Sequence, residues 1–184
     1  MDDDAALVTR CLRGEAEALR AFVRRFERLV FSLCYRLLGD QHEAEDVTQE
    51  TFYRAFRHLR HWDARRPLRP WLLKIAVNRC RTASSRRARQ PLVTEDCSHW
   101  SVERRSTSDL AEELQRLIAG LRPEYRQSFV LFYEHHLSLE EIAQILDCPT
   151  GTVKTWLYRA RRELAAQLQQ RNVVNEEGHE LHRF

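Results

Sequence analysis

The sequence predicts an all-α protein made of two small helical domains joined by a flexible linker. Apolar residues recur at helical spacing along most of the chain, and five glycines and five prolines among 184 residues are too few for turn-rich β structure. The polar stretch at 90–108, rich in Ser and Thr, breaks this spacing. We therefore expect domains at 1–89 and 109–171, a linker at 90–108 and a short tail at 172–184.

Charge is distributed unevenly along the chain. The net charge is +3, yet residues 57–90 carry 11 Lys/Arg against 1 Asp/Glu, and residues 150–171 carry 5 against 1. The segments before these blocks are acidic, with 8 basic against 11 acidic side chains at 1–56 and 5 against 11 at 91–149. Two separate contacts with a polyanion are the natural inference.

The cysteines and the start of the chain suggest a cytoplasmic protein. The five cysteines are scattered and include no CxxC pair, which fits reduced thiols. No run approaches the roughly 20 apolar residues that a membrane span needs. The acidic start, MDDD, does not resemble a signal peptide. We expect no membrane insertion.

No group of residues predicts a metal, a cofactor or catalysis. Cys97 and His99 lie two residues apart without a second pair, which is weak evidence for zinc, so neither a metal ligand nor a cofactor is expected. Acid and base side chains at a catalytic spacing are also missing from the sequence. The protein is therefore not expected to be an enzyme.

The first part of the chain predicts three helices. Apolar positions keep helical spacing over residues 5–38, with Gly14 and Gly39 at the ends of two helices. A third helix follows at about 41–59, and its outward face is acidic. This face is formed by Glu43, Asp46, Gln49, Glu50 and Tyr53. It either binds a partner or is simply solvated, and the helix alone does not decide between the two.

The helical periodicity breaks at 58–70, in the segment HLRHWDARRPLRP, and a helix resumes at about 71–90. Aromatic rings beside cations and amide side chains suit single-stranded nucleic acid, because splayed bases stack on rings. The alternative is that Trp62 and Trp71 only close the core and that the arginines are solvated. A net charge of +10 in residues 57–90 argues against this alternative, because such a density repels itself unless a polyanion offsets it.

Residues 137–164 predict a helix-turn-helix hairpin. Ser138 and Glu141 have the spacing of a capping box, and Pro149 disfavours helical geometry at Cys148. Thr150 is the expected N-cap of the second helix. The buried stripe of the second helix is formed by Val153, Leu157, Ala160 and Leu164.

The opposite face of the second helix is positively charged and rich in hydrogen-bonding groups, which suits a DNA major groove. An ordinary helical hairpin with a solvated basic face is the alternative. Helices at 110–120 and from Pro123 onward are expected to pack on this hairpin.

Three motifs follow one another along the chain: EDVTQETFYRAF at 45–56, WLLKIAVN at 71–78 and EEIAQILDCPTGTVKTWLYRARREL at 140–164. In this order, and across a linker of this length, they resemble the extracytoplasmic-function sigma factors, which are small two-domain bacterial transcription initiation factors. The resemblance covers about residues 5–170. It implies a sigma region 2 helical bundle in the first domain and a sigma region 4 helix-turn-helix domain in the second.

The resemblance also implies a role for each candidate site. The acidic helix would dock on the clamp helices of the largest subunit of core RNA polymerase, through Asp46, Gln49, Glu50, Phe52 and Tyr53. The loop at 61–70 would capture a flipped base of the minus ten element, whose lost stacking is offset by contacts in the protein. Candidates for minus ten DNA are Trp62, Arg65, Arg66, Leu68, Arg69, Lys74, Asn78, Arg81 and Arg86. Candidates for minus thirty-five duplex are Thr150, Thr152, Lys154, Thr155, Tyr158, Arg159, Arg161 and Arg162.

The sequence departs from the family at several positions. Leu68 stands where many relatives have phenylalanine, Thr82 stands where they have an acidic residue, and Pro67 and Pro70 stiffen the capture loop. Trp156 occupies a position where arginine is common, so a bidentate contact from that position is not carried over.

The implied function is that of an alternative sigma factor. Such a protein binds core RNA polymerase and directs promoter-specific initiation at minus thirty-five and minus ten elements. Members of the family are commonly held inactive by an anti-sigma protein, so we expect such a partner. The alternative is a stand-alone helix-turn-helix regulator, which leaves the basic aromatic loop at 58–70 unexplained.

Overall fold

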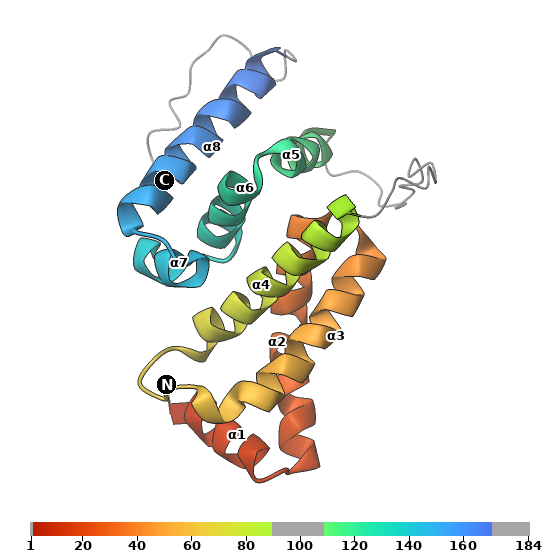
Figure 1. The fold of residues 1–184 in the computed structure, drawn as a ribbon, viewed down its shortest axis with the longest axis vertical. Coiled ribbons are helices and arrows are strands. Elements are labelled where there is room, and N and C mark those ends of the chain that lie inside the picture. Colours follow the sequence, from red (N-terminus) through yellow and green to blue (C-terminus); the bar gives the residue numbers. More distant parts are fainter. Residues whose placement is uncertain (1, 90–108, 171–184) are drawn as a thin grey trace.

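The computed structural model describes residues 2–89 and 109–170, and both segments are helical (Figure 1). The first segment contains α1 (Asp2–Leu12), α2 (Ala16–Leu38), α3 (Gln41–His58), the 3₁₀ turn η1 (Leu59–His61) and α4 (Leu68–Arg89). The second contains α5 (Asp109–Gly120), α6 (Pro123–Phe129), the π-helix η2 (Val130–Glu134), α7 (Leu139–Leu146) and α8 (Thr150–Gln170). The all-α prediction is confirmed. The expected linker at 90–108, which includes Cys97 and His99, and the tail at 172–184 lie outside the described residues.

Helices α2, α3 and α4 pack against one another, and α1 packs on α2. An aromatic cluster lies inside this bundle. The ring of Phe22, fully buried, is 5.0 Å from that of Phe26 and 6.3 Å from that of Phe52. Burying side chains of this size supplies about 1.5–3 kcal/mol each. The predicted glycine stops are also present, since Gly14 and Gly39 adopt left-handed backbone angles of 77° and 75° in φ.

Helix α4 begins at Leu68, before the start at about residue 71 that the sequence predicted. Pro70 lies in its first turn, where a backbone N–H has no acceptor within the helix, so the missing donor is tolerated there. The prediction of an irregular segment up to Pro70 was therefore wrong over its last three residues. The connecting loop is confined to residues 62–67.

The hairpin of α7 and α8 has the predicted capping box. The Ser138 hydroxyl accepts a 3.2 Å hydrogen bond from the backbone N–H of Glu141, whose carboxylate accepts one of 2.8 Å from the Ser138 N–H. Helix α8 starts one residue earlier than expected, because the Pro149 carbonyl accepts the Val153 N–H and Thr150 is already helical. The predicted apolar stripe of α8 is buried at Val153, Leu157, Ala160 and Leu164.

The helix that opens at Pro123 changes to π geometry in η2, which the sequence did not predict. The N–H of His135 donates to the carbonyl of Val130, five residues earlier, at 3.1 Å. This wider turn ends where the second domain meets the first, since both Glu134 and His135 contact residues of the first domain.

The two domains lie against each other (Figure 1). Helix α4 packs against α7, while α2 contacts α6 and η2. The buried apolar side chains of both domains belong to one hydrophobic cluster. The sequence predicted the two domains but not their mutual packing.

None of the helices in the described segments combines the length and the apolar character needed to cross a lipid bilayer. In the same residues, no three His, Cys, Asp or Glu side chains are grouped as metal ligands. Cys11, Cys34 and Cys80 are buried thiols, while Cys148 is partly exposed. A hydrogen bond with Cys34, together with burial, raises the pKa of the Cys80 thiol.

Candidate nucleic-acid and partner-binding surfaces

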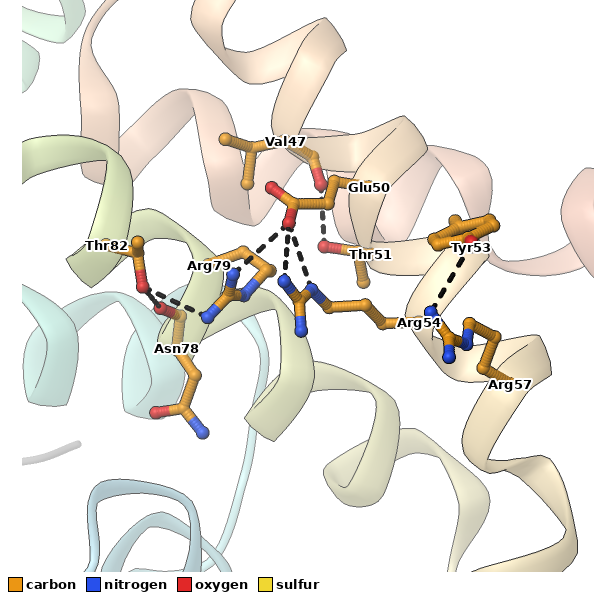
Figure 2. A network of polar contacts seen from close by, with 9 residues as sticks. All are labelled: Val47, Glu50, Thr51, Tyr53, Arg54, Arg57, Asn78, Arg79 and Thr82. Carbon is orange, nitrogen blue, oxygen red and sulfur yellow. Dashed lines mark hydrogen bonds and ion pairs between the residues drawn. The ribbon is translucent and has the colours of Figure 1, made fainter. Parts of the chain in front are cut away.

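Helix α3 presents a polar face to solvent. Asp40 fixes the start of the helix, because its carboxylate accepts a 2.7 Å hydrogen bond from a backbone N–H of the first turn. Asp46 and Gln49 are exposed on the helix that follows. Tyr53 is 60% exposed, and its ring centroid lies 5.6 Å from the guanidinium carbon of Arg57 (Figure 2). The predicted acidic face is therefore accessible to a partner.

Glu50 connects this face to helix α4 (Figure 2). Its Oε1 lies 2.9 Å from Arg54, one turn along α3, and 3.2 Å from Arg79 of α4. Arg79 also donates a 3.0 Å hydrogen bond to the hydroxyl of Thr82. Partial burial works to raise the pKa of the Glu50 carboxyl, but the hydrogen bonds from Arg54 and Arg79 outweigh it and hold that pKa below its usual value. Glu50 is thus a charged carboxylate held between two guanidinium groups.

Two of the predicted site residues are buried. Phe52 is 6% exposed and meets Phe22 edge-on, and Leu68 is fully buried at the start of α4. Both side chains fill the core of the first domain, because their positions coincide with the apolar stripes of their helices. This corrects their assignment to a polymerase contact and to a DNA contact.

The loop at 62–67 presents cations to solvent. The Asp63 carboxylate accepts the backbone N–H of Arg65 at 3.0 Å and its Nε–H at 3.1 Å, and these hydrogen bonds lower the pKa of Asp63. The side chains of Arg65 and Arg66 are 91% and 71% exposed. Trp62 is half-buried, and its indole nitrogen has no hydrogen-bond partner among the described residues. The loop therefore combines an aromatic ring with two unshielded guanidinium groups.

Helix α4 continues this basic surface toward its C-terminal end. Asn78 is half-exposed, and its side-chain amide points away from Arg79 and Glu50 (Figure 2). A groove of about 530 Å³ follows, lined by Arg81, Thr82, Ser85, Arg86 and Arg89. Guanidinium and hydroxyl groups together are suited to phosphate oxygens.

Three of the predicted DNA-contacting cations of α4 already have partners in the second domain. Arg69 donates a 2.7 Å hydrogen bond to the backbone carbonyl of His135. Lys74 Nζ lies 2.5 Å from the Asp147 carboxylate. The guanidinium of Arg81 donates to a side-chain amide oxygen of α6 at 2.8 Å and 3.1 Å. The structure thus separates these three cations from the exposed Arg65, Arg66 and Arg86.

Helix α8 exposes most of its predicted DNA face. Trp156 is half-buried in the helix, and Arg159 donates a 3.3 Å hydrogen bond to the Tyr125 hydroxyl. Thr150 and Thr152 are partly exposed. The exposed members of the face are Lys154, Thr155, Tyr158, Arg159, Arg161 and Arg162. A single helix therefore presents four cations together with hydroxyl groups that can hydrogen-bond.

Some residues of these surfaces were not singled out from the sequence. Arg79 was counted only as charge, although it joins α3 to α4, and Glu134 and Asp147 were not identified as partners of the first domain. These pairs join residues far apart in sequence, so no helical spacing connects them. The one available signal was the opposite charge of the segments that they join.

The folded chain is thus a two-domain helical nucleic-acid-binding protein with a separate acidic docking face. The family model described as Sigma-70 region 2 matches residues 22–90, and the one described as Sigma-70, region 4 matches residues 111–164. The first match ends near the end of α4, and the second contains the α7–α8 hairpin.

Curated relatives identify the family more closely. The chain is 34% identical over 173 residues to the ECF RNA polymerase sigma factor SigW of Bacillus subtilis (strain 168), a match that covers 85% of this chain and 91% of the relative. It is 30% identical over 181 residues to the ECF RNA polymerase sigma-E factor of Escherichia coli (strain K12), covering 90% and 94%. The chain therefore belongs to the extracytoplasmic-function (ECF) RNA polymerase sigma factors and acts as an alternative sigma factor in transcription initiation.

Solved structures share the fold. The sigma factor RpoE from Bartonella quintana, in a co-crystal with the anti-sigma factor NepR, superposes with a TM-score of 0.70 at 21% identity, over 82% of this chain and 96% of that one. CnrH, in complex with the cytosolic domain of CnrY, gives a TM-score of 0.66 at 24% identity, over 90% and 96%.

Proposed function

We propose that the sigma function is divided among three surfaces of this chain. The α3 face, with Asp46, Gln49, Glu50 and Tyr53, would dock on the clamp helices of the largest subunit of core RNA polymerase. The loop at 62–67 and α4 would bind the opened minus ten element, and the exposed face of α8 would bind the minus thirty-five duplex. The observation that carries this proposal is the presence of two basic surfaces and one acidic face on separate helices of the same chain.

The minus ten assignment is supported by the chemistry of the loop and of α4. An unpaired base has an exposed π-face, and an aromatic ring such as that of Trp62 can stack on it while nearby guanidinium groups neutralise the backbone. The amide of Asn78 adds donors and acceptors suited to a base edge. Arg65, Arg66 and Arg86 are the exposed cations available to phosphate.

The minus thirty-five assignment is supported by the geometry of the hairpin. A second helix with an exposed polar face fits the width of the major groove. Lys154, Arg161 and Arg162 can neutralise phosphates or donate to purines, while Thr152, Thr155 and Tyr158 can contact base edges or the backbone.

The remaining assignments follow from this division. We place the two functional domains at 1–89 and 109–171 and expect the chemistry of RNA synthesis to belong to the polymerase, so this chain would have no catalytic role. It would act in the cytoplasm, where the polymerase is. An anti-sigma protein is the expected regulator, since both similar solved structures are complexes and RpoE is bound in one of them to the anti-sigma factor NepR.

The test is transcription with purified components. The chain is added to sigma-free core polymerase with a promoter selected from genomic fragments, and we expect a stable complex and a specific transcript. Asp46→Asn with Gln49→Ala should weaken the complex with the polymerase, while the exposed control Glu140→Gln on α7 should not. Absence of both complex and transcript would refute the proposal. Tight specific duplex binding without polymerase would instead favour a stand-alone regulator.

A further inference from the structure

The interface between the two domains is formed by the same cations that are assigned to minus ten DNA. Arg69 binds the backbone carbonyl of His135, directly after the π-helix η2. Lys74 Nζ lies 2.8 Å from the carbonyl of Gln144 and 2.5 Å from the Asp147 carboxylate, at the end of α7. In both cases the acceptor is the C-terminal end of a helix.

Helix C-terminal ends resemble a phosphate in their charge. Their unpaired carbonyls carry a partial negative charge equivalent to roughly half an elementary charge, and they attract cations. Asp147 adds a full negative charge at the end of α7, and Glu134 adds another at the end of η2, where it lies 2.8 Å from Arg36 of α2. Region 4 therefore presents to α4 the kind of negative, oxygen-rich surface that a DNA backbone would present.

The contacts extend along the helices. Arg81, two turns beyond Lys74, donates to the amide oxygen of Gln127 at 2.8 Å. In the opposite direction, Arg126 of α6 donates a 2.9 Å hydrogen bond to the carbonyl of Leu37, near the end of α2. Arg69, Lys74 and Arg81 are thus all engaged within the chain and cannot bind phosphate at the same time.

The distance between the promoter elements leads to the same conclusion. The minus ten and minus thirty-five elements lie about 25 base pairs apart, which is about 85 Å along a straight duplex at roughly 3.4 Å per step. In this structure the minus ten helix α4 directly contacts the turn before α8, since Lys74 and Asp147 form an ion pair. The packed arrangement can therefore contact at most one of the two elements.

We propose that region 4 acts as an intramolecular competitor of DNA, in which the C-terminal ends of η2 and α7 occupy the cationic surface of α4. The inference rests on the proposed function, because it uses the minus ten assignment of Arg69, Lys74 and Arg81. The measured affinity for single-stranded DNA is then the intrinsic affinity reduced by the fraction of molecules in which the domains are apart. Any partner that separates the domains raises that fraction.

The test compares two isosteric double variants of the full chain. Glu134→Gln with Asp147→Asn removes the two carboxylates of the interface, and Asn tolerates the left-handed backbone at position 147 (φ 54°). The control, Glu124→Gln with Glu140→Gln, removes two exposed carboxylates of the same domain. Each protein is measured by small-angle X-ray scattering and by titration with a short mixed-sequence single-stranded DNA.

We expect the interface variant to be more expanded than the wild type and to bind the single strand about three- to tenfold more tightly, as two partly exposed ion pairs allow. The control should match the wild type in dimensions and should tighten DNA binding less. Equal dimensions and equal affinity in all three proteins would overturn the proposal. Expansion without a gain in affinity would overturn it as well, because region 4 would then not compete with DNA.

The scattering result also separates this inference from the proposed function. If no form of the chain binds core polymerase or single-stranded DNA, the proposed function fails, whereas the change in dimensions still reports whether the two carboxylates hold the domains together. If the double variant does not fold, Asp147→Asn alone provides the same comparison with Glu140→Gln alone as its control. Unchanged dimensions and affinity in Asp147→Asn would then overturn the proposal.

Discussion

Glu50 of α3 and Arg79 of α4 form a 3.2 Å ion pair that joins the acidic helix of the first domain to its basic helix (Figure 2). Arg79 is the more buried partner, with a side chain only 18% exposed, against 43% for Glu50. The carboxylate therefore remains accessible to an outside cation while it is fixed from the inside. A docking polymerase would meet a negative charge whose position is already determined.

Glu50→Gln should lower both stability and polymerase binding. The loss of the ion pairs with Arg54 and Arg79 should cost about 0.5–1 kcal/mol in the free energy of unfolding, measured by urea titration at neutral pH. Asp46→Asn, on the same exposed face, should weaken binding to core polymerase without changing the urea midpoint. Equal midpoints for Glu50→Gln and the wild type would show that the Glu50–Arg79 pair contributes nothing to stability.

Asn78→Ala should impair promoter opening more than polymerase binding. Its amide is available for a base, since it points away from the Glu50–Arg79 network (Figure 2). We expect fewer unpaired thymines in permanganate footprints at unchanged affinity for core polymerase. Ser84→Ala, an exposed change on the same helix, is the control. Normal opening by the Asn78 variant would remove this residue from the minus ten site.

Arg161→Ala should weaken binding of the holoenzyme to minus thirty-five duplex and flatten its salt dependence. An arginine that neutralises one phosphate contributes about 0.9 to the slope of log affinity against log salt, so the slope should fall by about one unit. Arg28→Ala, on the exposed surface of α2, should leave the slope unchanged. If both variants retain the wild-type slope, Arg161 is solvated in the complex.

His135 should make the folded state sensitive to mild acid. Burial, reinforced by Arg69, His136 and Arg36, lowers the pKa of His135 to about 4. The unfolded chain takes up this proton near pH 6.5, so between about pH 6.5 and 4 it binds more protons than the folded chain. Stability must then fall as the pH drops through this window, by about 2 kcal/mol between pH 6.5 and 5.

His135→Gln should remove most of that loss, and the exposed His136→Gln should not. The measurement is the free energy of unfolding from urea titrations at about pH 7 and about pH 5, on either side of the ordinary histidine pKa, taken as a difference for each protein. A loss in His135→Gln as large as in the wild type would assign the acid sensitivity to other groups.

Much of this fold could be predicted from the sequence because the determinants are local. Helical spacing of apolar residues, the two left-handed glycines and the Ser138–Glu141 capping box each act within a few residues, and each is present in the structure. Pro70 misled the prediction of the start of α4, because a proline in the first turn of a helix and a proline that breaks one look alike in sequence.

The candidate sites could be predicted less completely. An apolar residue beside a functional face, such as Phe52 or Leu68, has the same spacing whether it packs inside or contacts a partner, and only burial decides. Long cationic side chains such as Lys74 carry no signal of which acceptor they will contact. The domain interface depends on such side chains and on backbone carbonyls at helix ends, so no motif announced it.

The placement of Arg69, Lys74 and Arg81 against helix ends affects how salt titrations of this protein must be interpreted. Added salt weakens the contacts of α4 with region 4 as well as those with DNA. Part of the affinity lost by screening the DNA is then returned, because more molecules have the domains apart. The salt slope measured for single-stranded DNA would therefore underestimate the number of phosphates neutralised. The double variant that lacks the Glu134 and Asp147 carboxylates would give a slope closer to the true number.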